Sequence, residues 1–216
     1  MTVIEFNFND DWMGEISRRL GDLNDKTPDV ISQATNSTAR KARKLIVQSL
    51  REHYAEDAKT KEYNAAMKIA RASRKKYDAT IYIRGKVQNL RRFNVSPIDP
   101  PASGSSRPPT TRAQVLLQGG LKELNKGGIK AFITTFKNGD VVVAQRNGSF
   151  YTYHRPTGGI DRHHEAIDKL WSISIPKMAE SQLDPKTVRG NMRDTIQAIL
   201  VEEIEKQIAR QLAKHG

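Results

Sequence analysis

Residues 184–214 carry an apolar stripe that repeats every three or four positions. The stripe follows a cap-and-proline helix start at Asp184 and Pro185. Its members are Val188, Met192, Ile196, Ile199, Leu200, Ile204, Ile208 and Leu212. This spacing predicts a C-terminal helix of roughly 42 Å, because each helical residue rises ~1.5 Å. A helix of that length is long for a small domain to cover, so its apolar face constrains the whole fold.

A second long helix is predicted to start at Thr27 and Pro28, because threonine caps free amide groups and proline suits the first helical turn. Its apolar and small positions also recur every three or four residues: Val30, Ala34, Thr38, Ala42, Leu45 or Ile46, and Ser49 or Leu50. Four cations fall mostly beside or opposite this stripe: Arg40, Lys41, Arg43 and Lys44.

The intervening residues predict a third helix and a sheet. Residues 60–76 are rich in alanine and lysine, which favours a helix, and their cations near the end are Arg71, Arg74, Lys75 and Lys76. Residues 77–85 alternate apolar and polar side chains, the pattern of a half-buried strand. In residues 131–146, AFITTFKNGDVVVAQR, the Asn-Gly pair at 138–139 predicts a hairpin, with Phe132, Val141 and Val143 expected to face the helices.

The stretch from 94 to 114 is dense in proline, serine and glycine, which excludes a helix or a central strand there. So long a loop within a compact domain suggests a role in binding or assembly. Because it contains Arg107 and Arg112, we interpret it as a docking arm. The polar residues 147–168 are likewise expected to form a loop.

These patterns together predict an α+β protein. A small antiparallel sheet is expected to pack against the long N-terminal and C-terminal helices, with an extended Pro/Ser-rich loop. Residues 1–29 are interpreted as an acidic N-terminal extension, and residues 30–216 as a single domain whose loop spans 94–114 and whose C-terminal helix spans 184–214.

Charge is distributed unevenly along the 216 residues, whose net charge is +12. Residues 1–29 hold seven acidic side chains against three basic ones, whereas residues 36–92 hold sixteen basic against five acidic. Such a basic block attracts nucleic acid or an acidic protein surface; a solvated helix face is the alternative. The cations of this block that we expect to face DNA or an acidic partner are Arg40, Lys41, Arg43, Lys44, Arg71, Arg74, Lys75 and Lys76.

The sequence offers little support for catalysis. There is no cysteine, which excludes disulfides, thiolate metal sites and a cysteine nucleophile. DRHHE at 161–165 gathers ligand-type residues, but adjacent histidines in a loop point in different directions. No phosphate-loop, dinucleotide or serine-elbow motif occurs, so we expect no catalytic residue, cofactor or metal. No zinc finger, RNA-recognition signature or clear helix-turn-helix is present, and Trp12 and Trp171 are interpreted as core or interface anchors.

The N-terminus lacks a signal-peptide pattern, and no apolar run reaches the roughly 18 residues of a membrane span. These features predict a soluble, non-secreted protein without a membrane partner.

The order of six segments carries a resemblance: ATNSTARKARKLIVQSL, KIARASRKK, YDATIYIRG, VQNLRRF, AFITTFKNGDVVVAQR and LWSISIPKM. Over residues 30–212 this order resembles the minor tail protein Z family of lambda-like phages and, more widely, phage tail-completion and neck proteins. The acidic N-terminal extension and residues 147–168 have no counterpart in that family pattern. The resemblance implies a non-enzymatic virion protein at the head-proximal end of the tail, needed for head-tail joining.

The resemblance also implies partners. We expect a homo-oligomeric ring, with six subunits as the expected number, in contact with tail terminator or tube proteins, with head-tail connector proteins and with packaged DNA in the lumen. The protein would assemble in the host cytoplasm. A non-specific nucleic-acid-binding module is the alternative hypothesis, and a metal-dependent hydrolase around His163 and His164 is the third.

Overall fold

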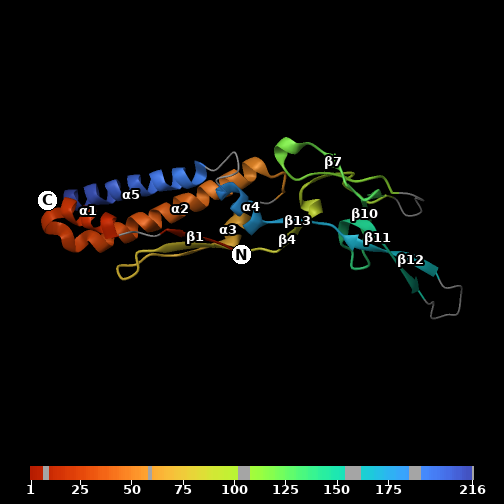
Figure 1. Cartoon of the computed structure of the whole chain (residues 1–216), viewed down its shortest axis with the longest axis horizontal. Helices are drawn as coiled ribbons and strands as arrows, with labels where there is room; N and C mark the ends of the chain where they lie inside the picture. The colour runs from red at the N-terminus through yellow and green to blue at the C-terminus, as the bar shows by residue number, and fades with distance from the viewer. Residues whose placement is uncertain (7–9, 58–59, 102–107, 154–161, 185–190, 216) are drawn as a thin grey trace. The chain divides into compact units, whose positions relative to one another are not determined.

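The computed structural model describes residues 1–6, 10–57, 60–101, 108–153, 162–184 and 191–215 (Figure 1). It confirms the α+β class, with helices and small antiparallel sheets. The chain divides into two compact units. Unit 1 comprises Met1–Leu50, Lys59–Lys86 and Ser174–Gly216, and unit 2 comprises Arg51–Ala58 and Val87–Ile173.

The N-terminal helix of unit 1 has the predicted start but not the predicted cap. Helix α2 spans Thr27–His53, and it follows α1 (Asp10–Leu20) and the 3-10 helix η1 (Gly21–Lys26) almost without interruption. Thr27 is itself helical, with φ −50° and ψ −47°. Its hydroxyl is buried without a hydrogen-bond partner among the described residues. The side-chain cap was therefore wrongly predicted, because a preceding helical turn occupies the place where the cap would bond.

The predicted C-terminal helix is present as α5 (Asn191–His215), preceded by a separate helix α4 (Ile175–Leu183). Ser174 caps α4 by accepting a hydrogen bond from the Lys177 amide, with proline in the first turn. Pro185 and Val188 lie outside the described residues.

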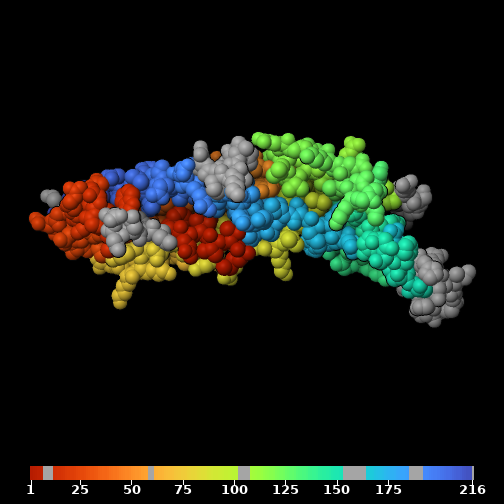
Figure 2. All heavy atoms as spheres, in the orientation of Figure 1, coloured from red at the N-terminus to blue at the C-terminus, as the bar shows by residue number. Residues whose placement is uncertain are grey.

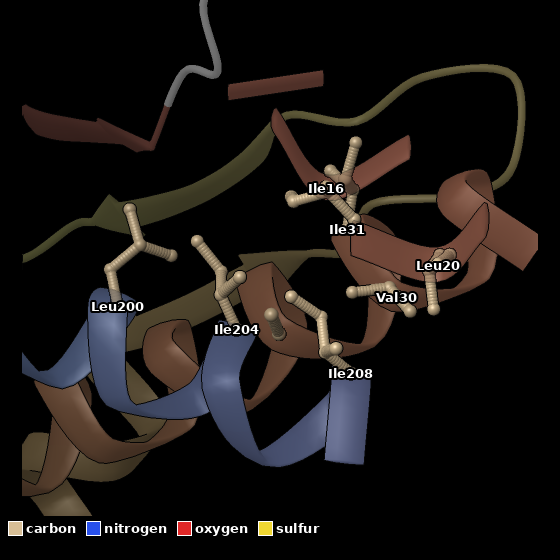
Figure 3. Packing of buried hydrophobic residues seen from close by; sticks show 8 residues of the cluster. Ile16, Leu20, Val30, Ile31, Leu200, Ile204 and Ile208 are labelled. Carbon is tan, nitrogen blue, oxygen red and sulfur yellow. The ribbon is translucent and has the colours of Figure 1, made fainter. Parts of the chain in front are cut away.

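The apolar stripes of α2 and α5 meet in the core of unit 1 (Figure 3). The buried cluster joins α1, α2 and α5 through Ile16, Leu20, Val30, Ile31, Ala34, Leu200, Ile204 and Ile208. Trp12 packs partly buried against it, which agrees with its interpretation as a core anchor. The long C-terminal helix is thus covered by another long helix, since Figure 1 shows α5 running beside α2.

Unit 1 also holds a three-stranded sheet in the order β1-β3-β2, formed by β1 (Thr2–Phe6), β3 (Ala79–Ile83) and β2 (Met67–Ala70). Strand β3 confirms the predicted alternating strand. The predicted helix over 60–76 is wrong beyond α3 (Thr60–Ala66). Residues 67–70 instead pair with β3, with Ile69 opposite Ile81, and this pairing buries Met67.

Residues 1–29, interpreted from sequence as an extension, contribute to unit 1. Strand β1 pairs with β3 along its whole length, and Ile16 and Leu20 of α1 are buried. The single domain over 30–216 stays a prediction, since the division into compact units does not test whether each folds alone. Among the described residues, no helix is long and apolar enough to cross a membrane.

Besides the hairpin sheet described below, unit 2 contains short strands and two 3-10 helices. The strands are β4 (Val87–Asn89), β5 (Asn94–Ser96), β6 (Arg112–Gln114), β7 (Lys122–Glu123), β8 (Asn125–Lys126), β9 (Ile129–Lys130) and most of β13 (Trp171–Ser174), and the 3-10 helices are η2 (Leu90–Arg92) and η3 (Leu117–Gly119). Both ends of the predicted arm belong to a sheet, because β5 pairs with β6 and Val95 and Ala113 are buried. The loop is therefore shorter than 94–114.

The hairpin predicted over residues 131–146 is confirmed. Strand β10 (Phe132–Thr135) pairs with β11 (Val141–Tyr153), and Gly139 takes φ +85° in the turn, where Asp140 N–H donates to the Asn138 side chain over 3.1 Å. Its core is formed within unit 2 by Ile133, Val142, Val143 and Ala144. Phe132 and Val141 are only partly buried.

Strand β11 continues past the predicted hairpin and pairs with β12 (Arg162–Lys169) in the sheet order β10-β11-β12. The loop predicted over 147–168 is therefore wrong for its described parts. A β-bulge between Arg146 and Phe150 accommodates Gly148 at φ +80°, so the turn-forming residues that suggested a loop lie within a strand.

We expect Ile204→Ala to destabilise the protein by about 2–5 kcal/mol, because it leaves a cavity where α5 meets α2. Val201→Ala on the same helix is the matched control, since that side chain is 37% exposed, and its effect should stay within about 0.5 kcal/mol. Urea denaturation of both variants measures the difference. Equal losses would contradict the packing described.

Candidate functional site

A groove between α2 and α5 gathers six cations of unit 1. Its volume is about 360 Å³, and its basic lining residues are Arg40, Lys41, Arg43, Lys44, Lys206 and Arg210. Buried Ala39, Ala42 and Ile46 carry the apolar stripe of α2, so the predicted α2 cations flank that stripe. On α5, Lys206 and Arg210 stand one turn apart beside buried Ile208. Packing the two apolar stripes therefore brings the two rows of cations together.

Lys41 is held by two carboxylates of α5. Its Nζ lies 2.8 Å from Glu203 and 3.6 Å from Glu202. Burial of the Glu203 carboxyl opposes its ionisation, but hydrogen bonds from Lys41 and Ser37 outweigh burial and lower the pKa of Glu203. The hydrogen bond to Glu203 in turn raises the pKa of Lys41. Lys41 is thus a structural link between the helices rather than an open cation.

The remaining cations stay available to a ligand. Within the described chain, the ion pairs of this groove involve only Lys41, and Arg40 donates to the Ser37 hydroxyl over 3.1 Å. The Arg43 Nε is buried and lacks an acceptor among the described residues, and the 3% exposed Gln207 has an equally unpaired Oε1. An anionic oxygen in the groove would accept from Arg43, and a charge-assisted bond of that kind is strong.

The structure does not bring the other predicted cations into the groove. Arg71, Arg74, Lys75 and Lys76 are exposed in the connection between β2 and β3, and none of them lines it. Arg74 pairs with Asp29 at 2.6 Å. The amide of Asn36 exchanges two hydrogen bonds with the backbone of Ala72 and so fastens this connection to α2.

Three acidic side chains of residues 1–29, Glu15, Asp25 and Asp29, form ion pairs within unit 1. Arg18 pairs with Glu15 at 2.8 Å and Lys26 with Asp25 at 2.5 Å. Arg19 forms a two-pronged pair with Glu205 of α5, at 2.5 and 2.6 Å.

The sequence pattern indicated the four α2 cations of the groove but not Glu203, Lys206 and Arg210 of α5. The apolar stripe of the C-terminal helix says nothing about the residues on its polar flanks. The spacing of 206 and 210 by four residues was the available signal. Of the two arm residues, Arg112 is exposed on β6 and Arg107 lies outside the described residues.

The histidine pair belongs to a strand and not to a loop. His164 lies opposite Tyr151 on β11, and their rings stack with centroids 5.7 Å apart. Among the described residues, no three His, Cys, Asp or Glu side chains stand close enough to hold a metal ion.

Comparison with known proteins gives one match. A family model described as prophage minor tail protein Z matches residues 15–215. Neither the curated proteins nor the solved structures include one that matches.

We expect Lys41→Met to raise the pKa of Glu203, because the burial that opposes ionisation remains while the compensating hydrogen bond is lost. In the wild type, the lowered Glu203 pKa contributes stability above the unfolded-state pKa, which is lost as pH falls through the folded value. The raised Lys41 pKa contributes below its unfolded value, and that contribution is lost as pH rises. The Lys41 contribution should vanish in the variant, and the Glu203 contribution should decrease, because only the hydrogen bond from Ser37 then opposes the effect of burial.

An NMR titration of Glu203 measures its pKa, and denaturation over acid, neutral and strongly alkaline pH measures both contributions to stability. Lys177→Met is the control, since its pair with Glu180 at 3.2 Å is exposed and should count for little. An unchanged Glu203 pKa in Lys41→Met would show that the ion pair does not govern this carboxyl.

Proposed function

Because this chain belongs to the prophage minor tail protein Z family and is therefore a structural protein of the phage tail, we propose that it completes the head-proximal end of the tail. In this role it is needed to join the tail to the head. The family match over residues 15–215 is the observation that carries the proposal.

The protein works in this proposal as a homo-oligomeric ring, with six subunits as the expected number. Its neighbours are the tail terminator or tube proteins on one side and the head-tail connector proteins on the other. Repeating one heterologous contact closes a ring when the rotation fits. The short sheets of unit 2 support this idea, since their edge strands offer backbone groups that a neighbouring subunit can use.

The α2–α5 groove faces a polyanion in the assembled tail, either DNA in the lumen or an acidic neck protein. Arg40, Lys44, Lys206 and Arg210 supply charge without a carboxylate partner among the described residues. Lys41 is left out of the set of cations to test. It forms an ion pair with Glu203, so its replacement would perturb folding as well as charge.

A second candidate function is a non-specific nucleic-acid-binding module. The same row of open cations favours it, and phosphate contacts of this kind need no sequence-reading motif. This function would operate in the free protein, whereas tail completion requires the assembled particle.

We predict that replacing Arg40, Lys44, Lys206 and Arg210 together by glutamine leaves folding intact, because glutamine is a good helix former. Phage carrying this variant should form heads and tails that fail to join or fail to keep their DNA. A matched variant with Lys61, Lys68, Lys122 and Lys126 changed to glutamine, all exposed elsewhere, should produce normal titres. Normal particles from the groove variant would contradict the proposal, because they would show that these cations lie on a solvated helix face without a binding partner.

The same two variants separate the candidate functions. If the free protein binds duplex DNA, the groove variant should lower the slope of log affinity against log salt by up to about 3.6, because each phosphate contact contributes ~0.9. No DNA binding at low salt, together with defective particles, would eliminate the nucleic-acid-binding module and keep tail completion.

A further inference from the structure

Two buried glutamines of unit 1 differ in how their amides are satisfied. Gln182 on α4 is 4% exposed, and its Oε1 accepts a hydrogen bond from the Ser49 hydroxyl over 2.8 Å. Gln207 on α5 is 3% exposed and lines the α2–α5 groove, and its Oε1 has no hydrogen-bond partner among the described residues. A buried polar atom without a partner costs stability and calls for an explanation. A ligand in the groove supplies one.

Arg43 on α2 lines the same groove and is unsatisfied in the same way. Its Nε is buried and lacks an acceptor within the described chain. A guanidinium stays charged at every physiological pH and has only donors, so it needs acceptor oxygens. An arginine of α2 and an amide of α5 thus line one groove of about 360 Å³, and each has a polar atom left for a ligand.

Four exposed cations surround these two inner groups. They are Arg40 and Lys44 of α2 and Lys206 and Arg210 of α5. The two cations of each helix lie four residues apart, about one turn, so each helix contributes a row of positive charge. Figure 2 shows α5, in blue, on the surface of unit 1. An anion from solvent therefore approaches between two basic rows and meets Arg43 and Gln207 at the inner side.

The donors of the groove suit a phosphate better than a carboxylate. The chain already supplies carboxylates to this place, and Glu202 and Glu203 both pair with Lys41. A further carboxylate has two oxygens in one plane, whereas the oxygens of a phosphate point in tetrahedral directions. A phosphate can therefore accept from donors of both helices at once. Arginine is also the side chain best suited to bind phosphate.

The Gln207 amide fits either kind of phosphate oxygen. A half-turn about its last side-chain bond exchanges Oε1 and Nε2. The amide can thus accept from a protonated oxygen of free phosphate, or donate to an anionic oxygen. A phosphodiester of nucleic acid has anionic oxygens and no proton to donate, so toward that ligand Gln207 is the donor.

We propose that the α2–α5 groove is a phosphate-binding site, in which Arg43 and Gln207 bind one phosphate of a nucleic-acid backbone. This proposal rests on the polyanion contact proposed above, and it decides between the two polyanions in favour of DNA. The two rows of exposed cations attract the neighbouring phosphates of the same strand. Free phosphate has the same chemistry, so it serves as the small probe of the site.

The test uses the full-length chain and two substitutions that keep an unbranched side chain. Gln207→Met removes the amide, and Arg43→Met removes the guanidinium. Gln182→Met is the control for the first, because that glutamine is equally buried but hydrogen-bonded. Arg91→Met is the control for the second, since this half-buried arginine belongs to unit 2 and lies 3.8 Å from Asp99.

Three measurements are made on each protein. NMR follows the side-chain N–H signals of arginine and glutamine during titration with inorganic phosphate. Fluorescence anisotropy gives the affinity for a labelled DNA duplex, with polyglutamate as the competing acidic polymer. Urea denaturation gives the stability without phosphate.

We expect phosphate to shift the side-chain signals of Arg43 and Gln207 in the wild type. Each groove variant should bind phosphate about 10-fold more weakly and should lose affinity for DNA, because one hydrogen bond to a charged group is lost. Both controls should bind normally. If Arg43→Met fails to fold, Arg43→Lys should show the same loss, since it keeps the charge but removes Nε.

Stability separates a ligand-binding Gln207 from a structural one. Gln207→Met should be at least as stable as the wild type, because it removes an unsatisfied buried acceptor. Gln182→Met should be less stable, because it leaves the buried Ser49 hydroxyl without its acceptor. A Gln207→Met protein that is destabilised and binds phosphate normally would show that the amide serves the fold alone.

Three further results would overturn the proposal. Phosphate that shifts neither side chain in the wild type shows that the groove is not a phosphate site. Phosphate binding without DNA binding limits the site to free phosphate. Polyglutamate that displaces DNA at equal charge concentration favours an acidic protein. The proposed function fails separately, because it is scored on head-tail joining in particles and not on ligand binding by the free protein.

Discussion

The packing of α2 against α5 is the interaction on which the rest of unit 1 depends. Helix α5 presents Leu200, Ile204 and Ile208 along one face, and α2 supplies Val30, Ile31 and Ala34 opposite. Because the cations flank these apolar faces, the same packing that buries the core also assembles the basic groove. A residue at the edge of the stripe thus belongs to both the fold and the site.

The groove illustrates how a structural pair and a binding surface share one helix interface. Lys41 and Glu203 join the two helices, and Arg19 and Glu205 join α1 to α5 in the same way. Of the two carboxylates, that of Glu203 is buried, whereas that of Glu205 is half exposed. Four groove cations, Arg40, Lys44, Lys206 and Arg210, have no carboxylate partner among the described residues, so their charge is open to a polyanion.

Several elements followed from local sequence. Residues 27–53 and 131–146 were predicted because a sustained apolar period and an Asn-Gly turn are strong signals. Residues 67–70 were mistaken for helix, since their alanine and lysine surroundings favour helix and only pairing with β3 makes them a strand. Strand β12 was mistaken for a loop for two reasons. Its side chains are largely polar, and its pairing with β11 is interrupted by a β-bulge between Arg146 and Phe150. The spacing of Lys206 and Arg210 places them on one helix face, but their meeting with the α2 cations depends on which helices pack together, which no local pattern contains.

The central claim is that this chain forms a ring where the tail meets the head. Electron cryomicroscopy of intact particles, with density assigned by a tag on the C-terminal residue, tests it most directly. The account predicts a ring of this chain at the head-proximal end of the tail, with repeated contacts between copies. Density at the distal tip, or a single unrepeated copy, would contradict it.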